Sequence, residues 1–378
     1  MRHRLIINIF LALIIFASQV NFSFAQKWKG KKKIKNGVIF MLNTEKGLWR
    51  NKKNIKMESV LTIGIEDGDE DYILAKPKSI VSDKNNNIYI CDYGDHCVKV
   101  YDTNGKFLRR IGNKGEGPME FIDPKYIAIN NQNQLCVLSR RRKMNYFTLE
   151  GEFIDSFTST NDFIYRNFTP VPWNDNILIT RELFPYEPMA KENKYTFFEL
   201  NPKGNIVNRY GALVHAATSN QGDIYMDALI TLNNNDKLFL LYQHKYRIDI
   251  YDKDIKHKMT ITRQFDLFSE NQIIDYKGWE LFETRTVMMY PLAVLPNNKI
   301  IVPILDRGKK YIEKFRKRDP SAKIFYDLYD QEGRFLQSFY WKENWEEIIV
   351  YIDMNGFVYT ISGPDEIPRV RKYKIFFE

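Results

Sequence analysis

Short apolar runs alternate with polar turns along most of this chain, and two consecutive stretches follow the same order. Residues 77–112 read PKSIVSDKNNNIYICDYGDHCVKVYDTNGKFLRRIG, and residues 124–159 read PKYIAINNQNQLCVLSRRRKMNYFTLEGEFIDSFTS. The two stretches align with a one-residue gap, and their first prolines, Pro77 and Pro124, lie 47 residues apart. A repeat of this length with four short apolar runs is typical of the blades of a β-propeller.

The turns between the apolar runs explain why each unit should fold as an antiparallel sheet. In the first unit, residues 83–87 (DKNNN) separate the first two runs and residues 102–105 (DTNG) separate the last two. Asn and Gly tolerate the positive φ of a tight turn, whereas β-branched and aromatic residues fill the runs between. We therefore predict four strands, a to d, in every unit.

Four later units keep the same turn landmarks, at 174–176, 233–236, 296–298 and 353–356. The sixth unit stops at its third apolar run, 370–376, and a matching fourth run, VLTIG, is found at 60–64. We predict that this N-terminal run pairs with the C-terminal strand and closes an all-β, six-bladed ring over residues 56–378. Closure removes the exposed sheet edges that invite aggregation. Seven blades is less favoured, because no seventh set of landmarks remains.

The first 25 residues have the pattern of a signal peptide. Arg2 and Arg4 precede an apolar run at 5–17, and residues 23–25 (SFA) form a small-x-small cleavage signal. The alternative is a transmembrane anchor, but the run is shorter than the ~20 residues a span needs. No cysteine follows the cleavage signal, which argues against a lipid anchor. We expect export to the periplasm, the cell surface or the medium, without a stable membrane span.

The net charge of +9 comes from one end of the chain. Eight of the 56 Lys and Arg residues precede Gly37, where there is no acidic residue, so 48 basic residues face 47 acidic residues in the remainder. Residues 26–55 are predicted to be a basic arm and lead-in, with 26–36 disordered because they hold six lysines and little to bury. The arm could instead contact an anionic lipid or glycan. A nucleic-acid partner does not suit an exported protein.

The three cysteines leave two readings open. Cys91 and Cys97 flank one loop between strands b and c, so a disulfide across that hairpin is geometrically feasible. The other reading is that these two residues and Cys136 are small buried apolar side chains.

Loop lengths point to one face of the disc. Loops a–b and c–d, on one face (the a–b face), are uniformly short. Loops b–c and the connections from strand d to the next blade, on the other face (the b–c face), carry every long insertion, at 182–194, 211–227, 266–291 and 306–325. Variable loops on a rigid scaffold commonly carry function, so we predict that the b–c face binds the ligand.

Basic and aromatic residues in these loops are the candidate ligand contacts. Arginine forks suit carboxylate, sulfate or phosphate groups, and aromatic rings can stack on sugars or peptide side chains. Each residue alone could equally be a solvated or packed side chain. The candidate residues are Arg140, Arg141, Arg142, Lys143, Arg307, Lys309, Lys310, Arg316, Arg318, Tyr186 and Trp279.

Catalytic signatures are missing from the sequence. There is no G-x-S-x-G, H-E-x-x-H, P-loop or Cys/His zinc pattern, and we expect no cofactor. His96, His215 and His244 fall in loops of the b–c face, so a metal site stays open; scattered surface histidines are the simpler reading.

The segment NNIYICDYGDHCVKVYDTNGKFLRRIGNKGEGPMEF, at 86–121, resembles the NHL-type repeat of exported bacterial six-bladed β-propellers. The lead-in GLWRNKKNIKMESVLTIG, at 47–64, is similar to the segment that this family places before its first blade. The resemblance implies a six-bladed propeller outside the cytoplasm. NHL propellers include binding scaffolds as well as lyases and lactonases with a metal in the central channel, and no catalytic motif of those enzymes aligns here.

The combined prediction is an exported, monomeric, non-catalytic binding or scaffold protein. Its b–c face would engage an extracellular glycan, peptide or protein. The alternative is a hydrolase or lyase, lactonase-like or NHL lyase-like, with its site in the central channel.

Overall fold

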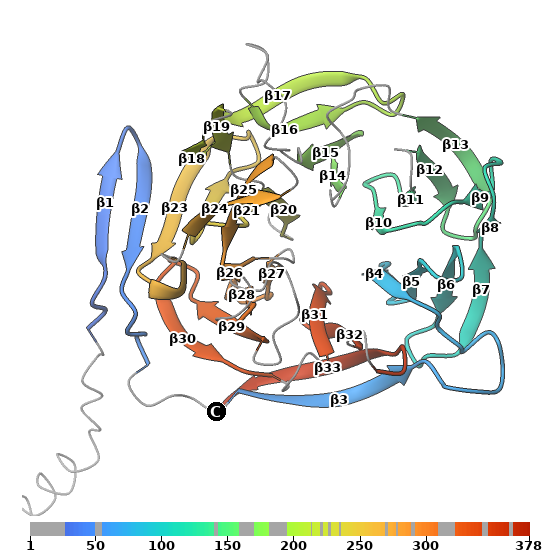
Figure 1. The fold of residues 1–378 in the computed structure, drawn as a ribbon. Coiled ribbons are helices and arrows are strands. Elements are labelled where there is room, and N and C mark those ends of the chain that lie inside the picture. Colours follow the sequence, from blue (N-terminus) through green and yellow to red (C-terminus); the bar gives the residue numbers. More distant parts are fainter. Residues whose placement is uncertain are drawn as a thin grey trace, which may run out of the picture.

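The fold is a ring of β-sheets (Figure 1), described by a computed structural model. The structure describes residues 27–49, 55–139, 143–158, 170–180, 195–212, 214–219, 222–225, 228–233, 236–268, 271–276, 279–288, 292–308, 322–341, 347–362 and 366–378. The predicted signal peptide lies outside these ranges. Within them, no helix combines the length and the apolar character that crossing a membrane requires.

The ring has six blades, numbered here in chain order, and the strands of each blade are given from the innermost to the outermost. Blade one consists of β4 (Pro77–Ser82), β5 (Ile88–Asp92), β6 (Cys97–Tyr101) and β7 (Phe107–Ile111). Blade two consists of β10 (Tyr126–Ile129), β11 (Gln134–Leu138), β12 (Lys143–Thr148) and β13 (Phe153–Thr158), and blade three consists of β14 (Val171–Trp173), β15 (Asn176–Thr180), β16 (Tyr195–Leu200) and β17 (Ile206–Ala212).

The later blades follow the same plan with local additions. Blade four consists of β20 (Ala228–Leu232), β21 (Leu238–Tyr242), β22 (Arg247–Tyr251) and β23 (His257–Arg263). Blade five has a split inner strand, β26 (Thr286–Val287) and β27 (Ala293–Val294), followed by β28 (Ile300–Asp306), β29 (Lys323–Tyr329) and β30 (Phe335–Phe339). Blade six consists of β31 (Glu347–Ile352), β32 (Val358–Ser362), β33 (Val370–Phe377) and β3 (Ile55–Ile63).

The predicted ring closure is confirmed. Strand β3 pairs antiparallel with β33 as the outer strand of blade six, from Ile55 opposite Phe377 to Ile63 opposite Val370. One bulge, between Ser59 and Leu61, interrupts the register. The N-terminal and C-terminal parts of the chain are therefore joined within one sheet, as Figure 1 shows along its lower edge.

The core is divided among the boundaries between blades. Six clusters of buried side chains occur, and each joins residues of two neighbouring blades. For example, Val98 of blade one and Val137 of blade two belong to one cluster, and Tyr359 of blade six and Ile88 of blade one belong to another. Both faces of most blades are buried, which explains why β21 is apolar throughout, and β5 is apolar up to its last residue, Asp92, rather than alternating.

The basic arm differs from the disordered tail expected from its composition. Residues Lys31–Lys35 form strand β1, and Val38–Asn43 form strand β2. Strand β2 pairs in parallel with β23, the outer strand of blade four, so blade four becomes a six-stranded sheet with β1 at its edge. Figure 1 shows this hairpin outside the ring beside β23.

A buried asparagine fixes the arm to two blades. The Asn43 Oδ1 atom accepts hydrogen bonds from Trp28 Nε1 (3.0 Å) and from the backbone N–H of Phe335 (2.8 Å). Its Nδ2 atom donates to the carbonyls of Thr262 (3.2 Å) in blade four and Gly333 (3.0 Å) in blade five. All the polar atoms of this side chain are thus satisfied, and residues far apart in sequence are held together.

The segment after β2 continues around the outside of the ring. The backbone N–H groups of Leu48 and Trp49 donate to the carbonyls of Phe335 (2.8 Å) and Leu336 (3.2 Å) on β30. The N-terminal segment therefore contacts the outer strands of blades four and five before it becomes the outer strand of blade six.

The a–b face consists of tight turns closed by short polar side chains. Asp83 Oδ1 accepts the backbone N–H groups of Asn85 (2.8 Å) and Asn87 (2.9 Å), and Asp102 does the same one hairpin later. Equivalent turns recur at Asn130, Asn201, Asp252, Asp330 and Asp353. These turns match the sequence landmarks, since Asx side chains favour such geometry.

All three cysteines are free and buried, so the feasible Cys91–Cys97 disulfide is not formed. The two residues belong to neighbouring strands, and Cys97 lies opposite Asp92 in the β5–β6 register rather than opposite Cys91.

Candidate functional site

The b–c face carries secondary structure that the a–b face lacks in the described residues. The connection from blade three to blade four forms the hairpin β18 (His215–Ser219) and β19 (Gly222–Tyr225). The connection from blade four to blade five holds a 3-10 helix (Asp266–Phe268) and the hairpin β24 (Asn271–Tyr276) and β25 (Trp279–Thr284). The two hairpins contact each other through β18 and β25, so they form one continuous structure.

A polar cluster fixes the base of the β24–β25 hairpin to blade five. Arg285 pairs with Asp306 through two hydrogen bonds of 2.9 and 3.0 Å, and both side chains are largely buried. Arg307 lies next to this pair, and its guanidinium donates to the carbonyl of Thr284 (3.4 Å) at the end of β25. The structure thus brings Arg307 to the strand that begins at Trp279, and both belong to the predicted set.

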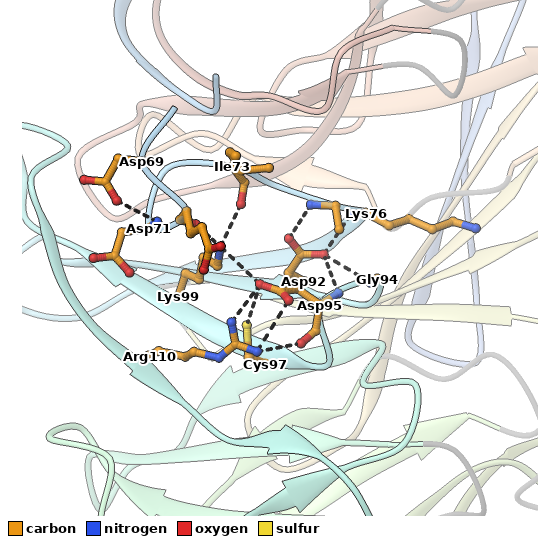
Figure 2. A network of polar contacts seen from close by, with 12 residues as sticks. Asp69, Asp71, Ile73, Lys76, Asp92, Gly94, Asp95, Cys97, Lys99 and Arg110 are labelled. Carbon is orange, nitrogen blue, oxygen red and sulfur yellow. Dashed lines mark hydrogen bonds and ion pairs between the residues drawn. The ribbon is translucent and has the colours of Figure 1, made fainter. Parts of the chain in front are cut away.

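The b–c loop of blade one is organised around a fully buried carboxylate (Figure 2). Asp92 accepts backbone N–H groups from Ala75 and Lys76, both at 2.7 Å, and from Gly94 at 3.1 Å. Gly94 is required by close approach, because a Cβ there would lie 2.8 Å from the Ala75 Cβ. Asp92 therefore fastens the loop to the connection that enters blade one.

Asp95, in the same loop, holds two cations. It pairs with Lys99 (3.1 Å) and Arg110 (2.9 Å), as Figure 2 shows. Burial opposes ionisation of Asp95, but hydrogen bonds and charge from Lys99 and Arg110 outweigh it and lower its pKa. Lys99 is only 3% exposed and also donates to the carbonyls of Glu70 (2.8 Å) and Ile73 (2.7 Å). This network positions the loop and occupies the Asp95 carboxylate with donors from the protein.

The other described candidate, Lys143, has a similar structural partner. Its ammonium donates to the carbonyls of Glu116 (2.9 Å) and Gly117 (2.7 Å) in the connection from blade one to blade two. Of the remaining candidates, Trp279 is described only as a strand position, opposite Tyr276. Arg140, Arg141, Arg142, Tyr186, Lys309, Lys310, Arg316 and Arg318 lie outside the described residues.

The three loop histidines lie in different parts of the b–c face. His96 is in the loop of blade one, where its Nδ1 accepts the backbone N–H of Asp123 (3.3 Å). His244 is in the loop of blade four, 3.1 Å from the Thr284 hydroxyl, and His215 begins β18. Within the described ranges, no three His, Cys, Asp or Glu residues are grouped as metal ligands.

A polar pocket that the sequence did not predict lies in blade six. The pocket has a volume of about 240 Å³, and Glu366 and Arg369 from the b–c loop of blade six help to line it. At its base, Glu347 is 3% exposed, pairs with Arg371, and accepts hydrogen bonds from Tyr373 (2.7 Å) and Thr360 (3.1 Å). Burial and the neighbouring Glu347 carboxylate raise the pKa of Tyr373. No repeat position carries an acid there, so no sequence signal marked this cluster.

Other buried carboxylates are likewise surrounded by donors. Glu199 accepts from Asn176, Asn208 and Tyr210 at 2.5 to 2.7 Å. Asp249 accepts from Arg247, Thr260 and Tyr242, and Asp327 accepts from Arg263, Tyr246 and Ser338. Glu199 and Asp249 thus tie the strands of one blade together, whereas Asp327 on β29 also ties blade five to Arg263 and Tyr246 of blade four.

Comparisons with known proteins agree with the fold. Two solved structures are similar: a Bacteroides fragilis protein provisionally described as exported (TM-score 0.54, 10% identity, covering 89% of this chain and 99% of that one) and a Bacteroides vulgatus member of the DUF4221 family (TM-score 0.55, 11% identity, covering 86% and 99%). At such identities the likeness shows the fold alone. A search of curated proteins found no match to the chain. A family model described as "6-bladed beta-propeller" matches residues 52–343, and the chain therefore belongs to this family, DUF5128.

Proposed function

We propose that this protein is an exported, non-catalytic binding propeller whose b–c face engages an extracellular glycan, peptide or protein. The observation that supports this proposal is that the loops of the two faces differ in length and structure. The described turns of the a–b face are short and closed by Asx side chains, whereas the b–c face carries two contacting hairpins. Elaborated loops on a rigid scaffold are the usual place for recognition.

The chemistry of the described carboxylates supports binding over catalysis. A general acid or base needs a carboxylate that can exchange a proton with a substrate. Asp92, Asp249 and Asp327 are instead buried and occupied by fixed donors. The alternative, a hydrolase or lyase in the central channel, would have to use other groups.

The test begins with the chain from Gln26 onward on glycan and peptide arrays. Hydrogen exchange of the protein with its best ligand then locates the contact. The proposal expects new protection in 93–96, 115–123, 215–225 or 271–284, on the b–c face, with the ligand recovered intact by mass spectrometry. Protection confined to the a–b turns, such as 83–87 and 130–134, contradicts the proposed face. A chemically altered ligand favours the enzymatic alternative.

A further inference from the structure

A pocket lies between the N-terminal arm and the outer strand of blade five, away from the b–c loops. It has a volume of about 470 Å³, within the range of small-molecule sites. Lys27, Lys29, Lys46 and Trp49 of the arm line it together with Arg263 of β23 and Gln337 of β30. We infer that this rim pocket binds a small ligand bearing an oxyanion group: a carboxylate, a sulfate or a phosphate.

The pocket is a built feature, because the arm that forms its wall is fixed on both sides. Asn43 and Trp28 anchor one side through their hydrogen bond of 3.0 Å. On the other side, the segment at Gly47 lies so close to blade five that a Cβ there would be 2.0 Å from the Leu336 carbonyl oxygen. The lysines are therefore held near the pocket by a docked backbone.

The charge around the pocket is unbalanced. Lys27, Lys29 and Lys46 are exposed, and none of them forms an ion pair with a described residue. Glu45 is the one acidic residue among the lining residues. Like charges that share a concave site repel one another and concentrate anions, so a bound anion relieves the repulsion.

Arg263 supplies a buried donor at the same place. Its side chain is 5% exposed, pairs with Asp327, and lies 3.8 Å from the ring centre of Phe335 and 4.7 Å from that of Phe265. Its Nε atom is buried and has no hydrogen-bond partner among the described residues. Its terminal nitrogen reaches the Glu45 carbonyl only at 3.4 Å. Because this guanidinium is held by its stacking and lines the pocket, it adds a fixed cationic group to a wall that already carries three lysines, which favours an oxyanion.

The pocket favours a compact ligand over a long polymer, since the arm and blade five enclose it on two sides. Trp49 lines the pocket with a half-buried ring that can pack against a sugar. These features fit a single acidic sugar or a similar hydroxylated acid. The inference concerns a different surface from the proposed b–c face and does not depend on it.

Isothermal titration calorimetry with four probes tests the inference: glucuronate, glucose 6-sulfate, glucose 6-phosphate and neutral glucose. We expect at least one acidic probe to bind with a dissociation constant near or below about 1 mM, glucose not to bind, and affinity to fall with added salt. The three acidic probes separate carboxylate, sulfate and phosphate as the source of the oxyanion.

Two triple variants with the same loss of charge locate the site. Lys27→Gln, Lys29→Gln and Lys46→Gln together should weaken binding about tenfold or more. The matched control is Lys31→Gln, Lys32→Gln and Lys33→Gln, which changes exposed residues of β1 on the same arm. The control should bind within about twofold of the unaltered protein, and both variants should keep its melting temperature. Equal weakening in both variants, or no binding of any acidic probe up to about 10 mM, overturns the inference.

Discussion

At the scale of single residues, Asn43 shows how one polar side chain can determine where a whole segment lies. Three of its four hydrogen bonds join the arm to blades four and five, and the fourth holds Trp28 within the arm. In the sequence it is one Asn before a polar stretch, much like the turn residues around it. Nothing local marks it, because its partners lie up to 292 residues away.

Replacing Asn43 by Ala should destabilise the protein by about 2–4 kcal/mol, because buried backbone groups of Phe335 and Gly333 lose their partner. Urea unfolding followed by fluorescence measures the change. Asn104→Ala is the matched control, since Asn104 is an exposed turn residue. If both variants unfold at the same urea concentration, Asn43 does not hold the arm.

The cysteines provide a second prediction at this scale. Burial raises the pKa of Cys97 and of Cys136 to about 12, from an ordinary value of 9.0. Folding therefore favours the protonated thiols, so their contribution to stability is complete below pH 9 and is lost as the pH rises towards 12. Native protein at pH 8 should leave a thiol reagent such as DTNB unreacted, and unfolding in urea should release three thiols per chain. Rapid reaction of the native protein contradicts the buried placement.

At the scale of elements, the basic arm is the segment for which composition predicted disorder and the structure has two strands, β1 and β2. Six lysines suggested disorder, but the segment KKKIKNGVIFMLN contains Asn36-Gly37, a strong hairpin signal, followed by an apolar run. Both residues adopt positive φ (51° and 77°), as the two central residues of a type I′ turn require. The lysines of β1 are exposed at the sheet edge, where charge discourages pairing with other chains. The turn chemistry thus outweighed the charge.

Truncation separates the two structural roles of the N-terminal segment, which are to extend blade four through β1 and β2 and to close the ring through β3. A chain that starts at Thr44 loses β1, β2 and the buried Met41 but keeps β3, so it should stay folded and monomeric with a stability lower by about 3–5 kcal/mol. A chain that starts at Gly64 also loses β3, which exposes the edge of β33, and it should aggregate. Light scattering after gel filtration and thermal melting distinguish the two. A monomeric Gly64 chain with an unchanged melting temperature refutes the closure.

At the scale of the whole molecule, the repeat predicted more of the fold than of the site. Blade number, strand order and ring closure follow from turn landmarks, because each blade obeys the same local chemistry. The networks around Asp92 and Glu347 each lie within or beside a single blade, whereas the network around Arg263 joins blades four and five. No turn landmark in the sequence marks any of the three. The site predictions rested on loop composition, and the described members, Lys143 and Arg307, have structural partners.

The b–c face proposal has its sharpest test in the loop of blade two. Replacing Arg140, Arg141 and Arg142 by Ser removes three cations from a loop opposite blade five in the ring. If an anionic polymer spans this face, the variant should bind it several-fold more weakly, and binding of the unaltered protein should fall steeply with salt because exposed contacts are screened. Replacing Lys31, Lys32 and Lys33 by Ser removes the same charge from the outer rim and should leave that binding intact. Melting temperatures should match in all three proteins, as surface substitutions rarely change stability. Unaltered binding in the arginine variant would mean that the face uses other residues or that the ligand is not an anion.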